Sequence, residues 1–124
     1  MVKIHLVNPS DIAFGAAVIT PRWLYVLAAA TPSEFGDPLL WDETLDPLDL
    51  VSVQAGVVIG IGIHTDNALR GYALGRLAKQ RGAIVIFRGI HATLYTEEAL
   101  TLGQSDFRFP VIRQTLVVRF PGVI

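Results

Sequence analysis

Two apolar runs without regular polar alternation stand out in the middle of the chain, at residues 57–63 and 83–87. Runs of this kind are typical of parallel strands that helices bury on both faces. The segment between them predicts an amphipathic helix, with Thr65 or Asp66 as its cap and Gly82 as a left-handed stop. Its expected apolar stripe is Leu69, Ala73 and Leu77. Strand, helix and strand together predict a right-handed crossover unit of an α/β sheet.

Shorter elements flank this unit. Residues 3–7 predict a first strand that stops at Asn8-Pro9, because proline continues neither a helix nor a β-ladder. Pro21 suits the first position of a helix over the apolar residues that follow it. The other expected elements are a second strand at 38–41, a short helix from Thr96 to Gly103, and a β-rich run at 114–120.

The composition favours one well-buried domain over residues 1–124, since 52% of the residues are hydrophobic and 17% are charged. The net charge is −1 and the basic residues are scattered, which argues against a nucleic-acid partner. The N-terminus lacks the long apolar region of a signal peptide, and no run approaches the roughly 20 apolar residues of a membrane span. We therefore expect a soluble, cytoplasmic domain with no membrane partner.

Several kinds of chemistry are excluded by what the chain lacks. It has no cysteine, which excludes disulfides, thiolate nucleophiles and iron–sulfur ligation. Gly60 and Gly62 resemble the start of a dinucleotide-binding fingerprint, but Thr65 stands where its third glycine would be. The sequence contains neither a phosphate-binding P-loop nor the elbow of a serine hydrolase. We therefore assign no catalytic residue.

Acidic residues crowd the connection around the second predicted strand. A solvated connection is the expected interpretation, and a metal site is the alternative. The acids lack the fixed spacing and the glycine of a calcium loop. They are Asp37, Asp42, Glu43, Asp46 and Asp49.

Polar loops follow the predicted strands at their carboxyl ends, which is where open α/β sheets bind ligands. The candidate loops are residues 8–10, 64–67 and 89–93. Glycine and alanine in the last loop allow a close approach of the backbone, and Thr93 adds a hydroxyl. The first and last loops are each open to two interpretations, an ordinary turn or a ligand-facing loop.

Two histidines, His64 and His91, lie in neighbouring candidate loops. They could form a metal or acid–base pair across adjacent strand ends. Alternatively, each imidazole packs against a ligand or donates a hydrogen bond to a loop carbonyl. The sequence aligns no carboxylate beside them, so we favour the second interpretation and assign no metal ligand. His5, inside the first strand, is expected to be structural.

Over about residues 3–103, the chain resembles the cobalamin-binding N-terminal domain of B12-dependent radical SAM proteins. The resemblance rests on the order and spacing of five segments. They are VNPS, ITPRWLYVLAAATP, WDETLDPLD, GIGIHTDNALRGYALGRLAKQRGA and GIHATLYTEEALTLG.

The resemblance implies a flavodoxin-like, Rossmann-like doubly wound fold, with a mainly parallel sheet of about five strands between two helical layers. Cobalamin would lie over the carboxyl edge of the sheet, with its nucleotide tail between sheet and helices. The cofactor-binding residues so implied are Asn8, Pro9, Ser10, His64, Thr65, Asn67, Gly89, His91, Ala92 and Thr93. The Asp-x-His-x-x-Gly motif that ligates cobalt in methionine synthase domains is absent here, as it commonly is in radical SAM relatives.

Such a module presents cobalamin to a radical SAM domain. That domain would here lie on a partner or a missing segment, because a chain without cysteine cannot hold the three-cysteine cluster. We therefore expect no catalysis from this chain alone.

The chain departs from the family in two places that bear on function. Arg88 stands where relatives usually have a glycine, and it could crowd the tail-binding loop or contact a phosphate. The pattern is lost over residues 104–124, which we interpret as a divergent or truncated tail. Its run at 114–120 would replace the fifth strand, pairing elsewhere on the sheet or with a second chain in a homodimer.

Two other functions stay open on the residues alone. One is a cofactor-free protein-interaction or assembly domain, which Arg88 and the tail favour. The other is a small enzyme or a binder of flavin or nucleotide in the same crevice. A flavin site would be expected to carry several hydroxyl groups in the loop after the first strand, and here Ser10 supplies only one.

Overall fold

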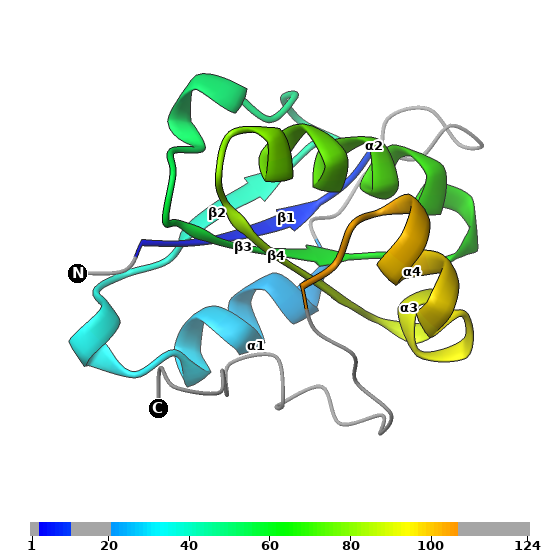
Figure 1. The fold of residues 1–124 in the computed structure, drawn as a ribbon. Helices are drawn as coiled ribbons and strands as arrows, with labels where there is room; N and C mark the ends of the chain where they lie inside the picture. The colour runs from blue at the N-terminus through cyan, green and yellow to red at the C-terminus, as the bar shows by residue number, and fades with distance from the viewer. Residues whose placement is uncertain (1–2, 11–20, 107–124) are drawn as a thin grey trace.

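The fold is an open sheet of parallel strands packed with helices (Figure 1), seen in a computed structural model that describes residues 3–10 and 21–106. The sheet order is β2-β1-β3-β4, and every pairing is parallel. The strands are β1 (Ile4–Asn8), β2 (Leu39–Asp42), β3 (Val58–Gly62) and β4 (Ile84–Arg88). The predicted α/β fold with a parallel sheet is confirmed for these strands. The fifth strand, predicted at 114–120, lies outside the described residues.

The helices follow the sequence pattern with one exception. They are α1 (Arg22–Ala30), α2 (Ala68–Gln80), α3 (Ile90–Leu94) and α4 (Thr96–Leu102), with short 3-10 turns η1 (Ser33–Phe35), η2 (Leu50–Ser52) and η3 (Thr65–Asn67). The exception is α3, which replaces most of the loop predicted at 89–93. Five residues are too few to show a hydrophobic period in the sequence. Within the described ranges, no helix is both long and apolar enough to cross a bilayer.

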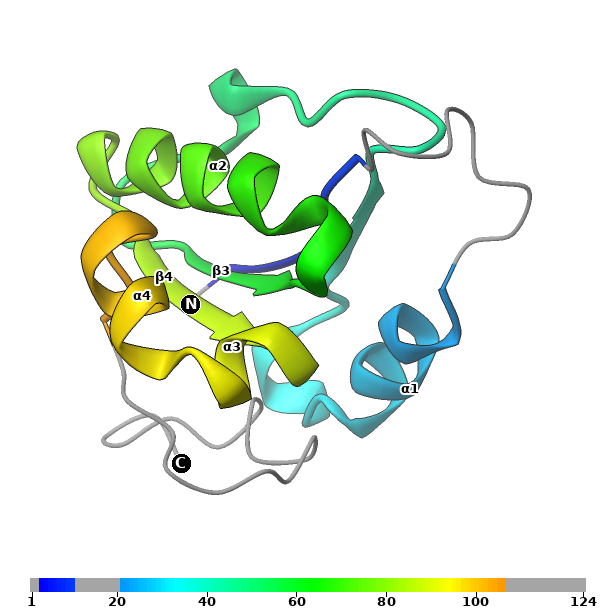
Figure 2. The ribbon, with the colours of Figure 1, turned by 90° about the vertical axis from the view of Figure 1, so that its right-hand side faces the viewer.

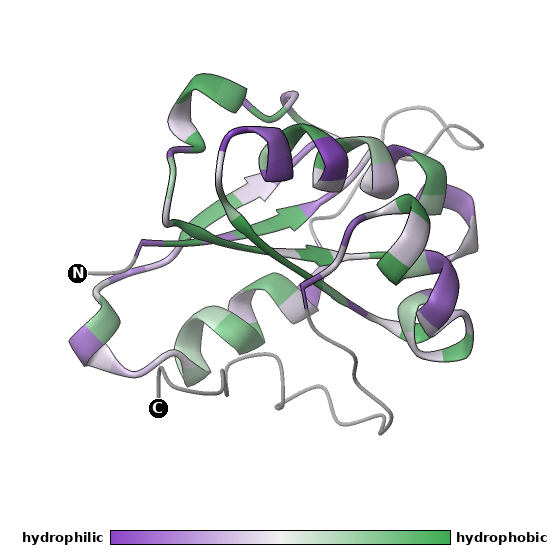
Figure 3. Ribbon diagram, viewed as in Figure 1, coloured by the Kyte–Doolittle hydropathy of each residue, from purple (hydrophilic) through white to green (hydrophobic). Residues whose placement is uncertain are grey.

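The two faces of the sheet are covered from opposite sides, by α1 and by α2 (Figure 1). Alternate side chains of a strand point to opposite faces. Leu6 and Ile86 therefore pack with Leu24 of α1, whereas Val7 and Phe87 belong to the larger cluster under α2. Strands β3 and β4 are hydrophobic along most of their length (Figure 3), which agrees with their burial, whereas β2 at the edge of the sheet is partly exposed. Helix α4 packs against α2 beside β4 (Figure 2).

The buried face of α2 is not the predicted one. Leu69 is 71% exposed and Leu77 is 37% exposed, whereas Leu74 is fully buried. Two glycines on the true inner face let the helix approach its neighbours closely. A Cβ atom on Gly71 would lie 2.4 Å from Cγ2 of Ile63, and one on Gly75 would lie 2.4 Å from the Gly103 carbonyl oxygen. Counting apolar residues misses a face built partly from glycine, so the predicted stripe of Leu69, Ala73 and Leu77 was wrong.

The end of the described chain forms hydrogen bonds with the outer edge of β4. The Asp106 N–H donates to the Val85 carbonyl at 2.7 Å, and the Asp106 carboxylate accepts from the Val85 N–H at 2.7 Å. Lys79 of α2 forms an ion pair with the same carboxylate. Asp106 thus ties the connection after α4 to both the sheet and α2.

The revised face of α2 can be tested by shortening one leucine on each side of the helix. We expect Leu74→Ala to lower the free energy of unfolding by about 2–5 kcal/mol, because it opens a cavity in a packed core. Leu69→Ala, the matched control, should change it by no more than about 0.5 kcal/mol. Urea unfolding followed by circular dichroism measures both. A greater loss of unfolding free energy for Leu69→Ala than for Leu74→Ala would show that the stripe predicted from hydrophobicity is the buried face.

Candidate functional site at the carboxyl edge of the sheet

The strand order places a topological switch point between the ends of β1 and β3. The chain passes from β1 to β2 on one side and from β3 to β4 on the other, so the connections diverge at this point. Ligands of open α/β sheets bind at such a switch point, outside the carboxyl ends of the strands. The loops after β1, β3 and β4, which carry the predicted site residues, all emerge at this edge.

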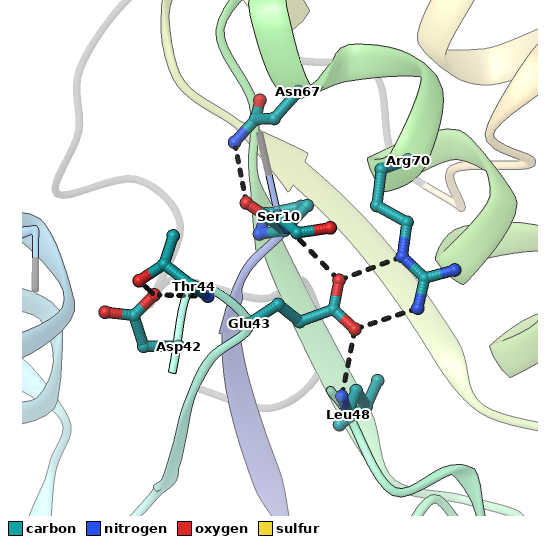
Figure 4. Close-up of polar contacts among 8 residues, drawn as sticks. Ser10, Asp42, Glu43, Thr44, Leu48, Asn67 and Arg70 are labelled. Atoms are coloured by element: carbon teal, nitrogen blue, oxygen red, sulfur yellow. Dashed lines mark hydrogen bonds and ion pairs between the residues drawn. The ribbon is translucent and has the colours of Figure 1, made fainter. Parts of the chain in front are cut away.

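Asn67 joins the loop after β1 to the loop after β3. Its side-chain amide donates to the Pro9 carbonyl at 3.3 Å, and its Oδ1 accepts from the His64 N–H at 2.8 Å. The residue is only 1% exposed, and Figure 4 shows its side chain directed toward the loop after β1. Because the Asn67 amide already has partners inside the protein, its role is to hold the loops after β1 and β3 together.

His64 begins the η3 turn at the end of β3. Its Nδ1 atom accepts a hydrogen bond from the Asp66 N–H at 3.2 Å. The prediction that Thr65 or Asp66 caps this helical segment was therefore wrong. His64 and Thr65 themselves are exposed at the edge.

The third predicted loop is a glycine followed by the short helix α3. Gly89 has a φ of 98°, and a Cβ atom on it would lie 2.6 Å from the Ile63 carbonyl oxygen, so this position requires glycine. The Thr93 hydroxyl donates to the Gly89 carbonyl at 2.9 Å, and Ala92 is buried. The predicted ligand-facing loop is thus a closely packed helical turn whose hydroxyl has an internal partner.

His91 has a carboxylate partner that the sequence did not reveal. Its Nε2 atom lies 3.0 Å from Oε1 of Glu98, and its Nδ1 atom lies 3.3 Å from the Thr65 hydroxyl. The Tyr72 hydroxyl donates to the same Glu98 oxygen at 2.8 Å. The hydrogen bond from His91, and to a smaller extent the one from Tyr72, lowers the pKa of the Glu98 carboxyl. Burial is the largest cause that raises the pKa of the Tyr72 hydroxyl, followed by its hydrogen bond to Glu98.

This network assigns His91 a fixed ring position rather than a place in a metal cluster. In residues 3–10 and 21–106, no group of three or more His, Asp or Glu side chains is arranged to hold a metal ion. His5 is buried in β1, where its Nδ1 atom accepts from the Trp41 indole at 2.9 Å. That environment agrees with the structural role predicted for His5.

Glu43 is the largest departure from the sequence expectation (Figure 4). The predicted solvated connection places this carboxylate in water, yet its side chain is 1% exposed. Arg70 of α2 donates to both oxygens, at 3.0 Å and 2.9 Å. The N–H groups of Leu48 and Ser10 donate to it at 2.9 Å and 3.2 Å. Glu43 therefore links the loop after β1, the turn after β2, and α2.

The pKa of Glu43 reflects this environment. Burial raises it, but the hydrogen bonds from Arg70, Leu48 and Ser10 together outweigh burial, so the pKa lies below its ordinary value. A charge-assisted, bidentate contact with arginine is among the stronger hydrogen-bonded pairs in proteins. The neighbouring carboxylate of Asp42 accepts from the Asn8 amide at 3.1 Å and from Thr44. Two consecutive acids thus hold the ends of β1 and β2 together.

A separate cavity of about 330 Å³ lies between α1 and the end of β2. None of the predicted cofactor-binding residues lines this cavity. Its lining comprises Leu24, Tyr25, Leu40, Trp41, Asp42, Leu45 and Asp46.

The Glu43 contacts predict a pH-dependent contribution to stability. We expect Glu43→Gln to lower the free energy of unfolding by about 1–3 kcal/mol at neutral pH, because its amide NH₂ faces N–H donors. The pKa of Glu43 is depressed in the folded state. Its contribution to the free energy of unfolding is therefore complete above the ordinary pKa of a glutamate and is lost as the pH falls through the pKa of the folded state. The difference between wild type and variant should therefore shrink in acid.

Urea unfolding between neutral pH and the acid limit of folding measures this difference. Glu34→Gln, at an exposed position in η1, is the matched control and should stay close to wild type throughout. An equal effect of both variants, or a Glu43→Gln difference that is independent of pH, would contradict the assignment.

Comparison of the chain with protein-family models, with curated proteins and with solved structures found no match in any of the three.

Proposed function

We propose that this chain is a cobalamin-binding module that holds the cofactor over the carboxyl edge of its sheet and does not catalyse a reaction by itself. The observation that carries the proposal is the convergence of the segments after β1, β3 and β4 at the carboxyl edge of the sheet, with Asn67 joining the first two. The resemblance of these same segments to the cobalamin domains of radical SAM proteins supports cobalamin as the ligand.

The predicted residues divide into three groups by exposure, and the division fits a flat ligand lying on the edge. His64 and Thr65 are exposed there and would contact the cofactor. Ser10, Gly89 and Thr93 are partly buried. The others, which are Asn8, Pro9, Asn67, His91 and Ala92, are buried and would position the surface rather than form its outer layer.

The finer architecture belongs to the same proposal. A flavodoxin-like sheet with helical layers on both sides and a fifth strand beyond β4 would complete the edge. Its supports are the placement of α1 and α2 on opposite faces and the two hydrogen bonds between Asp106 and Val85.

The cofactor would be used by another domain. Bound cobalamin supplies organometallic cobalt chemistry, to which the protein adds binding and orientation. Radical generation needs an iron–sulfur cluster with cysteine ligands, and this chain has no cysteine. The partner proposed is therefore a radical SAM domain on a separate chain or segment.

Titration of the purified protein with hydroxocobalamin, with gel filtration to separate bound from free cofactor, tests the proposal. We expect retention with a Kd of tens of micromolar or below, equivalent to about −6 kcal/mol or stronger. Thr65→Glu, which places a charged chain on the exposed edge, should weaken retention by about tenfold or more, or about 1.4 kcal/mol. Gln54→Glu adds the same charge near the amino end of β3 and should leave binding unchanged.

Failure of wild type to retain cofactor would contradict the proposal, as would equal binding by the two variants. Circular dichroism of each variant checks that the fold is preserved.

The alternative function is an interaction module, which exposed apolar side chains on α1, β2 and the following turn favour. Tyr25 is 57% exposed, Leu40 is 38% exposed and Leu45 is 69% exposed. In the described sheet β2 is also an edge strand, which another chain could extend. Lack of cofactor retention together with concentration-dependent self-association in light scattering would favour this function. The C-terminal run predicted to dimerise lies outside the described residues.

A further inference from the structure

Arg88, the last residue of β4, carries a buried positive charge. The residue is 7% exposed, and among the described residues its buried Nε atom has no hydrogen-bond partner. The ion pairs found in the described part of the chain are Arg70–Glu43, Lys79–Asp106 and His91–Glu98, and none of them includes Arg88. Burying a charge without an opposite charge is unfavourable. The guanidinium therefore has unused capacity to bind an anion.

The guanidinium lies against the indole ring of Trp23. Its central carbon is 4.6 Å from the centroid of the ring. Gly62 of β3 is in register with Arg88 and makes room for this arrangement, since a Cβ atom there would lie 2.3 Å from Cζ2 of Trp23. An aromatic ring attracts and orients a cation, but it does not neutralise it.

The Arg88–Trp23 pair lies at the carboxyl edge of the sheet, where open α/β sheets bind ligands. Arg88 ends β4 at the same carboxyl edge as the loops described above, and Trp23 places it on the face covered by α1. Arginine presents a planar fork of N–H donors that matches the oxygens of phosphate. Burial lowers the pKa of Arg88, which agrees with a guanidinium separated from water.

We propose that Arg88, backed by Trp23, binds a phosphate group at the carboxyl end of β4 on the α1 face of the sheet. The group can be free phosphate or part of a larger ligand, including the phosphodiester of the cofactor proposed above. The site rests on Arg88, Trp23 and Gly62, and it stands whether or not cobalamin is that ligand.

Thermal unfolding and calorimetric titration with inorganic phosphate test the site, with chloride used to hold the ionic strength constant. We expect a saturable rise in the unfolding midpoint of wild type with phosphate, because a ligand that binds only the folded state stabilises it. Arg88→Gln should weaken phosphate binding by about tenfold or more. The matched control is Arg22→Gln, which removes an exposed arginine next to Trp23 and should respond as wild type does.

Arg88→Gln removes a buried charge and also its contact with Trp23, so the midpoint of the variant in chloride serves as the baseline for its response to phosphate. Equal responses of wild type and Arg88→Gln to phosphate, or no response of wild type beyond that to chloride, would overturn the proposal.

Cobinamide, which lacks the nucleotide and its phosphodiester, distinguishes the two sources of phosphate. Weaker binding of cobalamin but not of cobinamide by Arg88→Gln would identify the phosphate as that of the cofactor. Binding of inorganic phosphate by a protein that retains no cobalamin would leave this site standing and refute the proposed function.

Discussion

The carboxylate of Glu43 is the contact on which the geometry of the carboxyl edge depends. It is buried, so its charge requires donors from the protein, and it obtains them from three separate segments. Arg70 fixes α2 over the end of β2, while Ser10 and Leu48 fix the loops on either side. Asn67 provides the corresponding contact between the ends of β1 and β3. The edge is thereby held by internal hydrogen bonds, which is the preorganisation that reduces the cost of binding a large ligand.

Glycine shapes the same edge by allowing close packing. Gly89 lets β4 turn into α3 against the Ile63 carbonyl, and Gly62 lets the ring of Trp23 lie on β3 beneath Arg88. The edge therefore has two chemically different sides. On the α2 side, neutral and acidic groups surround His91, and on the α1 side a cation lies on an aromatic ring. A ligand lying across the carboxyl edge would meet a hydrogen-bonding surface at one end and a positive charge at the other.

The strands could be predicted because unbroken apolar runs, proline and glycine are local signals, and α1, α2 and α4 were predicted for similar reasons. The inner face of α2 could not, because Gly71 and Gly75 replace apolar side chains at its closest contacts. The partners of Glu43 and His91 were also missed. Arg70 follows Glu43 by 27 residues, and Glu98 reaches His91 only because α3 and α4 are separate helices. Parallel topology predicts that the segments after β1, β3 and β4 share one edge of the sheet, but it predicts neither α3 in place of the last loop nor the exposure of each residue, which depends on these long-range contacts.

Amide hydrogen exchange of the ligand-free protein tests most directly whether the carboxyl edge is formed before any ligand binds. The N–H groups of Ser10 and Leu48, which donate to Glu43, and of His64, which donates to Asn67, should exchange far more slowly than in an unstructured peptide. The N–H of Val51, which donates to the exposed carboxylate of Asp49, should exchange faster than these three. Exchange of Ser10, Leu48 and His64 at unprotected rates would contradict a preformed edge.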